Sequence, residues 1–311
     1  MKKLVGVLLL VSLMACVLTA CSGNGTSAYG GNSSTPSSNT SVPSSNTSAF
    51  NSGKDIVVVS REDGSGTRGA FIELFGIEQK NDDGTKKDLT TKEAIIAKQT
   101  DVMMTNIAGD AYAIGYISLG SLNNTVKALQ IEGVTPTSEN VKNGTYPIAR
   151  PFNIATKGEV SQLAQDFIDF ILSSQGQTVV AGSYIAINES APDYAGSKPS
   201  GKIVVAGSSS VTPIMEKLKE AYLKINTNAT IEIQMSDSSA GITGAMDGTC
   251  DIGMASRELK ESELEKLTST QIALDGIAVI VNHENPAANF AKDQVKAIFT
   301  GELLTWSAIS K

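Results

Sequence analysis

The sequence is poor in the side chains from which metal sites and histidine-dependent catalysis are built. Among its 311 residues are one histidine, His283, and three cysteines, Cys16, Cys21 and Cys250. Zinc sites use several histidine or cysteine ligands, and a catalytic triad uses a histidine as its base. Metal sites built on these residues, and triads that need a second histidine, are therefore not expected, and we expect no cofactor.

Positive charge is also scarce. The chain has 25 basic and 32 acidic residues, for a formal net charge of −7. Proteins that bind the phosphate backbone of nucleic acids need clustered Lys and Arg, so we expect no nucleic-acid partner. Hydrophobic residues make up 41% and charged residues 18% of the chain. This is a globular composition, and the length suits about two domains.

The first segment predicts export. Two lysines precede an almost wholly apolar run, Leu4–Leu18, which is too short for a comfortable membrane span and typical of a signal-peptide core. The run ends in Leu18-Thr19-Ala20-Cys21, which resembles the bacterial lipobox, whose cysteine is acylated and becomes the first mature residue. We expect residues 1–20 to be a lipoprotein signal peptide and Cys21 to carry a lipid anchor on the extracytoplasmic face of a bacterial cell membrane. The alternative is an ordinary signal peptide cut near Ala20.

Residues 21–53 are predicted to form a flexible linker. From Ser22 to Gly53 there is no charged residue, and most positions are Ser, Asn, Thr, Gly or Pro. Such a composition cannot bury enough apolar surface to order itself. We expect a tether with a root-mean-square reach of roughly 30 Å between the anchor and the globular part.

The globular part, from Lys54, alternates β-branched runs with helical patterns. Ile56–Val59 and Ala273–Asn282 predict strands, whereas Val160–Leu172 and Val211–Leu223 have the apolar spacing of helices. This alternation favours α/β lobes with mostly parallel sheets. A Ser-, Pro- and Gly-rich segment, Glu189–Gly201, is interpreted as a surface connection between two structured blocks.

Loops of small polar residues recur where a predicted strand ends and a helix begins. They are Ser60–Arg68, Gly207–Pro213 and Ser236–Gly241, and a fourth, Ala255–Glu258, follows a strand-like segment. A helix start exposes unpaired backbone N–H groups and the positive end of the helix dipole, and hydroxyls add further donors. One such loop usually means only a helix cap, but several in one α/β protein predict a shared anion site.

Residues Gly64–Gly69 also match the G-x-G-x-x-G dinucleotide fingerprint. However, Arg61, Glu62 and Asp63 precede the first glycine, where that fingerprint needs a tight apolar turn. The charges would sit badly against a pyrophosphate, so a dinucleotide site is disfavoured.

The same loops carry a resemblance to a known family. Val58–Arg68, Gly207–Pro213, Ser238–Gly241, Asp251–Leu259 and Phe299–Glu302 resemble the phosphate-binding lipoproteins (PstS) of bacterial phosphate ABC transporters. The resemblance covers nearly all of residues 54–311. It implies an α/β class II periplasmic-binding-protein fold, with two lobes, a hinge and a ligand cleft between the lobes.

The order of the matching segments differs from the family pattern. In the family, the segment resembling Lys202–Ser310 comes first and that resembling Asp55–Asn188 follows, whereas here they are reversed. We interpret this as a circular permutation; the alternative is a rearranged product that does not close into a working fold. The permutation predicts that Lys54 and Lys311 lie close together. Carried onto this order, the resemblance implies lobe A at 54–154 plus 281–311 and lobe B at 155–280.

The resemblance also implies which residues bind phosphate. They are Ser209, Ser210, Ser238, Ser256, Arg61, Asp63, Ser65, Gly66 and Thr67. Arg61 would be the cationic partner, and the hydroxyls and helix-start N–H groups would donate. Asp63 would accept the proton that hydrogen phosphate carries and sulfate lacks, and a site with such an acceptor rejects an anion without the proton. Some members place a second acidic acceptor at the position of Ser256, so discrimination here would rest more on Asp63.

The function implied by the resemblance is capture of inorganic phosphate and its delivery to the membrane permease subunits of an ABC importer. The protein would be a monomer, held to the membrane by Cys21, and not an enzyme. Three alternatives stay open. The first is a receptor for another oxyanion, such as sulfate or molybdate, and the second is an enzyme that acts on phosphate esters through a serine or Asp63. The third is a sensor or surface protein that keeps the fold without transport.

Overall fold

The computed structural model describes residues 49–81 and 86–309. The predicted signal peptide, Cys21 and most of the predicted linker lie outside the described residues. Within the described ranges, no helix has the length and apolar character needed to cross a membrane.

One sheet path passes through the whole described fold. Its strands are β1 (Val57–Arg61), β4 (Ile95–Ala97), β5 (Ala113–Ser118), β6 (Lys127–Ala128), β8 (Ala149–Thr156), β9 (Gly201–Ser208), β10 (Ala229–Ser236), β11 (Ile252–Ala255) and β12 (Thr268–Val281). The order is β10-β9-β11-β8-β12-β5-β1-β4, and β6 pairs with β12. Two small pairs stand apart, β2 (Glu78–Lys80) with β3 (Lys86–Asp88) and β7 (Gln130–Ile131) with β13 (Asn289–Phe290).

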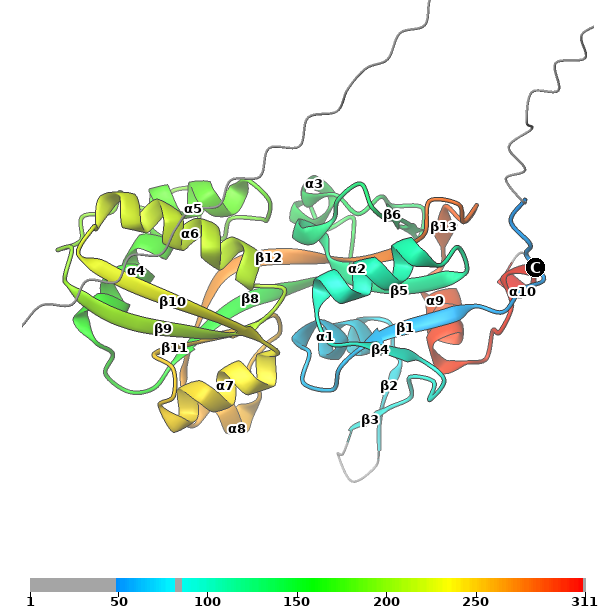
Figure 1. The fold of residues 1–311 in the computed structure, drawn as a ribbon, viewed down its shortest axis with the longest axis horizontal. Helices are drawn as coiled ribbons and strands as arrows, with labels where there is room; N and C mark the ends of the chain where they lie inside the picture. Colours follow the sequence, from blue (N-terminus) through cyan, green and yellow to red (C-terminus); the bar gives the residue numbers. More distant parts are fainter. Residues whose placement is uncertain (1–48, 82–85, 310–311) are drawn as a thin grey trace, which may run out of the picture. The chain divides into compact units, whose positions relative to one another are not determined.

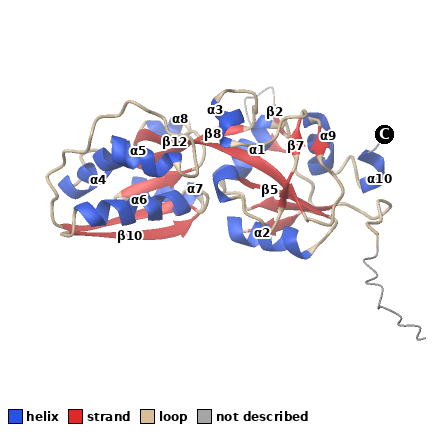
Figure 2. Ribbon diagram, turned by 90° about the horizontal axis from the view of Figure 1, so that it is seen from above, coloured by secondary structure: helices blue, strands red, loops and turns tan. Residues whose placement is uncertain are grey.

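Helices cover the sheet on both faces in each lobe. They are α1 (Gly66–Leu74), α2 (Thr100–Gly109), α3 (Ser138–Lys142), α4 (Gln162–Leu172), α5 (Ser174–Ala181), α6 (Thr212–Ile225), α7 (Ser238–Asp247), α8 (Glu261–Leu264), α9 (Lys292–Thr300) and α10 (Trp306–Ile309), with a 3₁₀ turn, η1, at Leu119–Ser121. In lobe A, α1 and α9 pack in one hydrophobic cluster and α2 in another. In lobe B, α4, α5 and α6 lie on one face of the sheet and α7 on the other, as Figures 1 and 2 show.

Two long strands join the lobes. β12 pairs with β8 over residues 268–276 and with β5 over residues 277–281, so it belongs to both lobes (Figure 1). The side chains pass from the hydrophobic cluster of lobe A to that of lobe B between Ile148, just before β8, and Phe152 on β8. On β12 they pass from the lobe B cluster to the lobe A cluster between Ala273 and Ile277. The predicted lobe boundaries, at residues 154/155 and 280/281, stay a prediction. β12 pairs with strands of both lobes and therefore does not mark one residue at which lobe B ends.

The predicted elements are found where the patterns place them, but the predicted sheet direction is only half right. The stretch Val160–Leu172 contains α4, and Val211–Leu223 contains most of α6. β1, β4, β5 and β9, β10, β11 pair in parallel, as expected. β8 and β12 are antiparallel to their neighbours, because they carry the chain between the lobes in opposite directions.

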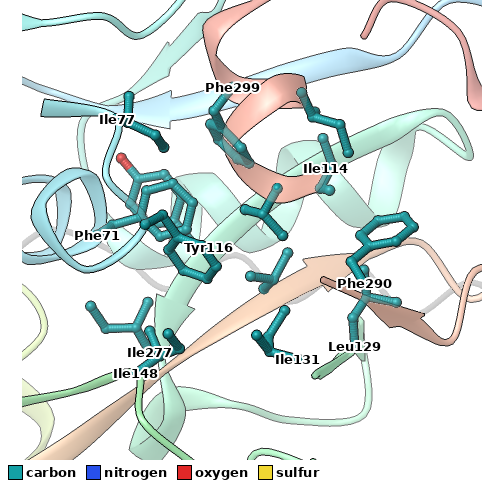
Figure 3. Packing of buried hydrophobic residues seen from close by; sticks show 14 of the residues in the cluster. Phe71, Ile77, Ile114, Tyr116, Leu129, Ile131, Ile148, Ile277, Phe290 and Phe299 are labelled. Carbon is teal, nitrogen blue, oxygen red and sulfur yellow. The ribbon is translucent and has the colours of Figure 1, made fainter. Parts of the chain in front are cut away.

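An aromatic stack fixes α1 against the sheet of lobe A. The rings of Phe71 on α1 and Tyr116 on β5 are 3.8 Å apart and nearly parallel, and Phe299 on α9 meets Phe71 edge-on at 4.7 Å (Figure 3). The phenol of Tyr116 reaches beyond the stack. It hydrogen-bonds the Ser60 hydroxyl at 2.9 Å and accepts from the Arg61 N–H at 3.1 Å. The core therefore positions the loop that begins at the end of β1.

The segment Glu189–Gly201 is a surface connection, as predicted, with no helix or strand before Gly201. It is nevertheless fastened to lobe B. The Tyr194 hydroxyl and the Ser197 N–H both donate to the buried carboxylate of Asp166 on α4. The Asn226 side chain holds the Pro199 carbonyl at 2.9 Å.

The two ends of the described chain lie side by side (Figure 1). The Ile56 N–H donates to the Leu304 carbonyl at 2.7 Å, and the Trp306 N–H donates to the Lys54 carbonyl at 3.3 Å. Lys311 lies outside the described residues, and the circular permutation stays a prediction. The last residues of the predicted linker pack on lobe A, since the Phe50 ring contacts both Tyr112 and Trp306.

Candidate functional site

A cluster of hydroxyl groups forms where the two lobes meet. The hydroxyls of Thr67 in lobe A and Ser210 in lobe B are 2.8 Å apart. Arg61 in lobe A donates from Nη2 to the Ser209 hydroxyl in lobe B at 3.0 Å. Residues from two of the predicted loops are thus in direct contact, although they are more than 140 positions apart in the chain.

Most of the predicted side chains are buried in this cluster. They are Arg61, Ser65, Thr67, Ser209, Ser210, Ser238 and Ser256. Gly66, at the start of α1, is buried as well. Buried hydroxyls and charges need partners, and several of these side chains are partners of one another: Arg61 bonds Ser209, Thr67 bonds Ser210, and Ser238 lies 3.4 Å from Ser256.

Arg61 is the cation of the cluster. Its side chain is 1% exposed, and it donates from Nε and Nη2 to the two carboxylate oxygens of Glu62 at 2.8 and 2.7 Å. It also donates to the Ala97 carbonyl at 3.2 Å and lies 3.4 Å from the Thr100 hydroxyl. The guanidinium is therefore held rigidly, with its charge largely compensated, while one nitrogen still reaches Ser209.

Lobe B contributes a second group of serines. The Ser208 hydroxyl donates to that of Ser256 at 3.0 Å, and the Ser256 N–H donates to the Ser238 hydroxyl at 3.1 Å. Gly66 of lobe A approaches this group closely. A Cβ atom on Gly66 would lie 2.5 Å from the Ser238 oxygen and 2.8 Å from the Ser256 oxygen, so only glycine allows this close contact between the lobes.

Helix N-termini surround the cluster. α1, α2 and α7 begin at Gly66, Thr100 and Ser238, and α6 begins at Thr212, two residues after Ser210. Ser65 is the N-cap of α1, and its hydroxyl accepts from the Arg68 N–H at 3.3 Å. Four helix dipoles thus end within the same set of loops, and each favours negative charge.

The chemistry available is recognition of an oxyanion. Hydroxyls, N–H groups at helix starts and one guanidinium are donors to oxygen, and hydrogen bonds to an ionised acceptor are roughly twice as strong as neutral ones. An anion would replace hydroxyl–hydroxyl bonds by these stronger bonds. Among the described residues no group of His, Cys, Asp or Glu is placed to hold a metal ion, and His283 is exposed and contacts the Asn124 carbonyl.

Comparisons with known proteins agree with this chemistry. A model of the PBP superfamily domain matches residues 42–175 and 192–310. A protein of Streptococcus agalactiae named phosphate-binding protein PstS 2 is 55% identical over 259 residues, which is 82% of this chain and 88% of the relative. The chain belongs to the PstS family of the PBP superfamily.

Two further matches come from Streptococcus pneumoniae. The PstS 2 protein of that species is 50% identical over 256 residues, covering 82% of this chain and 87% of the relative. A crystal structure described as the phosphate-binding protein of a phosphate ABC transporter is 49% identical. It covers 82% of this chain and 99% of its own, with a TM-score of 0.66.

Asp63 is the one predicted site residue that this PstS-family structure does not bring into the cluster. Its side chain is 96% exposed, and Oδ1 pairs with Nη1 of Arg68 at 2.8 Å. The neighbouring carboxylate, Glu62, is the one that faces the cluster, with 16% of its side chain exposed. The predicted role of Asp63, accepting a proton from the ligand, has no contact here to support it.

Sequence reasoning missed three members of the site. Glu62 stood inside a quoted motif, but nothing in the sequence separated it from Asp63. Ser208 lies in the Gly207–Pro213 loop, but the resemblance predicts only Ser209 and Ser210 as donors there. Thr100 begins α2, a helix whose N-cap is Gln99, without a side-chain cap. The available signal was Thr100-Asp101 before an apolar run, a common helix start.

Proposed function

We propose that this protein binds inorganic phosphate outside the cytoplasm and delivers it to the membrane permease subunits of an ABC importer. The observation that carries the proposal is the contact between Arg61 and Ser209, together with that between Thr67 and Ser210. Donors from both lobes converge on one buried point, so an anion bound there touches both lobes at once. The relatives are themselves named phosphate-binding proteins.

The individual roles follow from the donor chemistry. Arg61 would supply charge, and the hydroxyls of Thr67, Ser209, Ser210, Ser238 and Ser256 would donate. Gly66 would contribute a backbone N–H at the start of α1, whereas the Ser65 N–H is already bonded to the Glu62 carbonyl at 3.0 Å. Each oxygen of a tetrahedral anion accepts several hydrogen bonds, which matches this excess of donors. The lipid anchor on Cys21 and the monomeric state are part of the proposal.

The carboxylates near the site decide whether it can distinguish phosphate from other oxyanions. With Asp63 exposed, Glu62 is the carboxylate that contacts Arg61, and both its oxygens are already used by that contact. Donors alone do not distinguish hydrogen phosphate from sulfate. A receptor for sulfate or molybdate is therefore the second candidate, and this distribution of carboxylates is the observation that favours it.

Calorimetric titration tests the proposal. The chain from residue 22 onward would be stripped of bound anion and titrated with phosphate, sulfate and molybdate between pH 5 and pH 9. We expect tight 1:1 binding of phosphate and much weaker binding of sulfate. Equal binding of sulfate would replace the phosphate proposal by that of a general oxyanion receptor, and no binding of any anion by the folded protein would refute both. A chromogenic phosphate ester tests the enzyme alternative, which predicts turnover.

We also infer that the order of the two segments is a circular permutation. The adjacency of Lys54 and Trp306 supports it, because it brings the ends of the described chain within reach of a short connection. A chain that begins at Lys202, continues from residue 311 through a short Gly/Ser linker to Asp55 and ends at Asn188 should then fold and bind phosphate as the present order does. Failure of that chain to fold would contradict the permutation.

A further inference from the structure

A buried ion pair lies where the two strands pass between the lobes. Arg150 on β8 and Asp275 on β12 are directly opposite each other in the strand register. The Arg150 Nη2 and Nε atoms are 3.2 and 3.4 Å from Asp275 Oδ2. Their side chains are 2% and 1% exposed, so this is one of the most buried ion pairs in the described part of the chain.

The pair is connected to both lobes. The second terminal nitrogen of Arg150, Nη1, donates to the backbone carbonyl of Ser256 at 3.1 Å. On the other side, Asp275 Oδ1 accepts from the N–H of Gly120 in η1 of lobe A at 3.2 Å. A continuous path of polar contacts therefore runs from Ser256, in the hydroxyl cluster, to lobe A through the joining strands.

This pair is an expensive way to stabilise a fold. Burial raises the pKa of the Asp275 carboxyl and lowers the pKa of the Arg150 guanidinium, although each partner opposes the other's shift. Buried ion pairs can often be replaced by apolar side chains without loss of stability. Three further buried hydroxyls lie beside the pair: that of Ser118 faces both Asp275 and Tyr184, and that of Ser121 faces Tyr184. Such a polar region is not explained by stability alone.

We propose that Arg150 and Asp275 are a positioning pair that holds the Ser256 loop against lobe A and thereby couples phosphate binding to the arrangement of the lobes. The inference rests on the proposed function, because it assigns a role in the same site. Neither residue touches the ligand in this proposal. Arg150 acts through the Ser256 carbonyl and Asp275 acts through Arg150.

The test replaces the pair by apolar side chains of similar size, in the double variant Arg150→Met/Asp275→Leu. The net charge of the protein is unchanged, so a loss of affinity cannot come from a change in net charge. A control variant, Lys202→Met/Glu232→Leu, makes the same replacement in a pair between β9 and β10 whose atoms are 2.6 Å apart. That pair lies within lobe B and reaches neither Ser256 nor lobe A.

Three quantities are measured on the wild type and both variants: the phosphate Kd, the phosphate dissociation rate and the distance between lobes. The distance is measured by pulsed electron paramagnetic resonance in a Cys250→Ala chain, with spin labels at the exposed positions Lys98 and Gln234. For Arg150→Met/Asp275→Leu we expect thermal stability at least equal to that of the wild type. We also expect a Kd at least tenfold weaker, most of it through faster dissociation, and a broadened distance distribution with phosphate present. The control should match the wild type.

Wild-type affinity and an unchanged distance distribution in Arg150→Met/Asp275→Leu would overturn the positioning role. If the wild type itself binds no phosphate, the proposed function fails, and the distances measured without ligand still decide the inference, since unchanged distances refute it. If the double variant does not fold, Asp275→Asn takes its place in the same measurements. That substitution keeps an oxygen for the Gly120 N–H and removes the charge that holds Arg150.

Discussion

Replacing Gly66 by alanine should weaken phosphate binding without weakening the fold. The added Cβ would stand 2.5 Å from the Ser238 oxygen and 2.8 Å from the Ser256 oxygen, both in the opposite lobe. An ordinary contact between a Cβ atom and an oxygen needs about 3.4 Å, so the lobes must separate there by about 0.9 Å. Overpacking of this kind costs about 1–3 kcal/mol. That cost corresponds to a Kd about 5- to 150-fold weaker, since each 1.4 kcal/mol is tenfold.

The fold itself should tolerate the substitution. The φ angle of Gly66 is not in the left-handed region, and alanine in a helix is favoured over glycine by about 0.5–1 kcal/mol. The collision can be relieved by opening the lobes, which breaks contacts at the site and leaves the core of each lobe intact. We therefore expect the ligand-free variant to unfold at the temperature of the wild type or slightly above it.

Titration calorimetry with phosphate and thermal unfolding without it measure the two effects. Gly69→Ala is the matched control, because it lies about one turn further along α1 and the nearest atom to its Cβ would be Arg257 Cδ at 4.0 Å. It should bind phosphate as the wild type does. Equal affinity in Gly66→Ala and Gly69→Ala would show that the lobes do not close on Gly66 when phosphate binds, and the site as described would be wrong.

Three further predictions address the cation, the connecting segment and the response to acid. Arg61→Met should abolish measurable phosphate binding and lower the free energy of unfolding by up to about 3 kcal/mol, because it leaves a partly buried carboxylate unpaired; binding within tenfold of wild type in titration would contradict this. Tyr194→Phe removes the hydrogen bond to Asp166 and should cost about 1–2 kcal/mol in urea unfolding, with phosphate affinity unchanged; a changed affinity would contradict a purely structural role. Burial alone would raise the pKa of Glu263, but the hydrogen bonds and charge of Arg257 outweigh it and hold that pKa below its ordinary value. The stability that Glu263 contributes is therefore present above its unfolded pKa of about 4.3 and is lost as the pH falls through the lower folded value. Between about pH 5 and pH 3, the free energy of unfolding of Glu263→Gln should therefore fall less than that of the wild type. Parallel curves of unfolding free energy against pH would refute this role of Glu263.

The loops of the candidate site could be predicted from the sequence because their positions follow from alternation. Each lies after a strand and before a helix, and the carboxyl ends of parallel strands meet at one edge of a sheet. Within each lobe that argument brings the loops together, Arg61 and Thr67 in lobe A and Ser210 and Ser238 in lobe B. The two sets meet because the antiparallel joining strands β8 and β12 turn the parallel strands of the two lobes toward each other.

Which of two adjacent side chains faces inward could not be predicted. Successive side chains of an extended segment point to opposite sides, so a shift of one residue at the end of β1 exchanges Glu62 and Asp63. The shift is set by Tyr116, whose phenol holds the Ser60 hydroxyl and the Arg61 N–H. Tyr116 lies in β5, 55 positions after Arg61, so the sequence around Arg61 does not predict this contact.

The start of β12 and its antiparallel pairing with β8 also could not be predicted from the sequence pattern. β12 begins at Thr268, in a polar stretch that looks like a loop, and becomes apolar only from Ile272. Its first residues form a strand because they pair with β8, which is 112 or more positions earlier in the chain. Tertiary pairing of this kind overrides local preference in strands.

Because Glu62 faces the site in place of Asp63, the site attracts an anion in a different way from the one the sequence predicts. With Glu62 bound to Arg61 through both oxygens, the pair is close to neutral, and attraction depends on helix starts and hydroxyls whose dipoles are fixed by the fold. Fixed dipoles act only over short distances, so binding should respond weakly to salt in comparison with a site of uncompensated charge. A phosphate Kd that weakened steeply between low and moderate sodium chloride would mean that Arg61 attracts the anion as a free charge. Glu62 would then have to leave Arg61 when phosphate binds, and its carboxylate would become available to accept the proton of hydrogen phosphate.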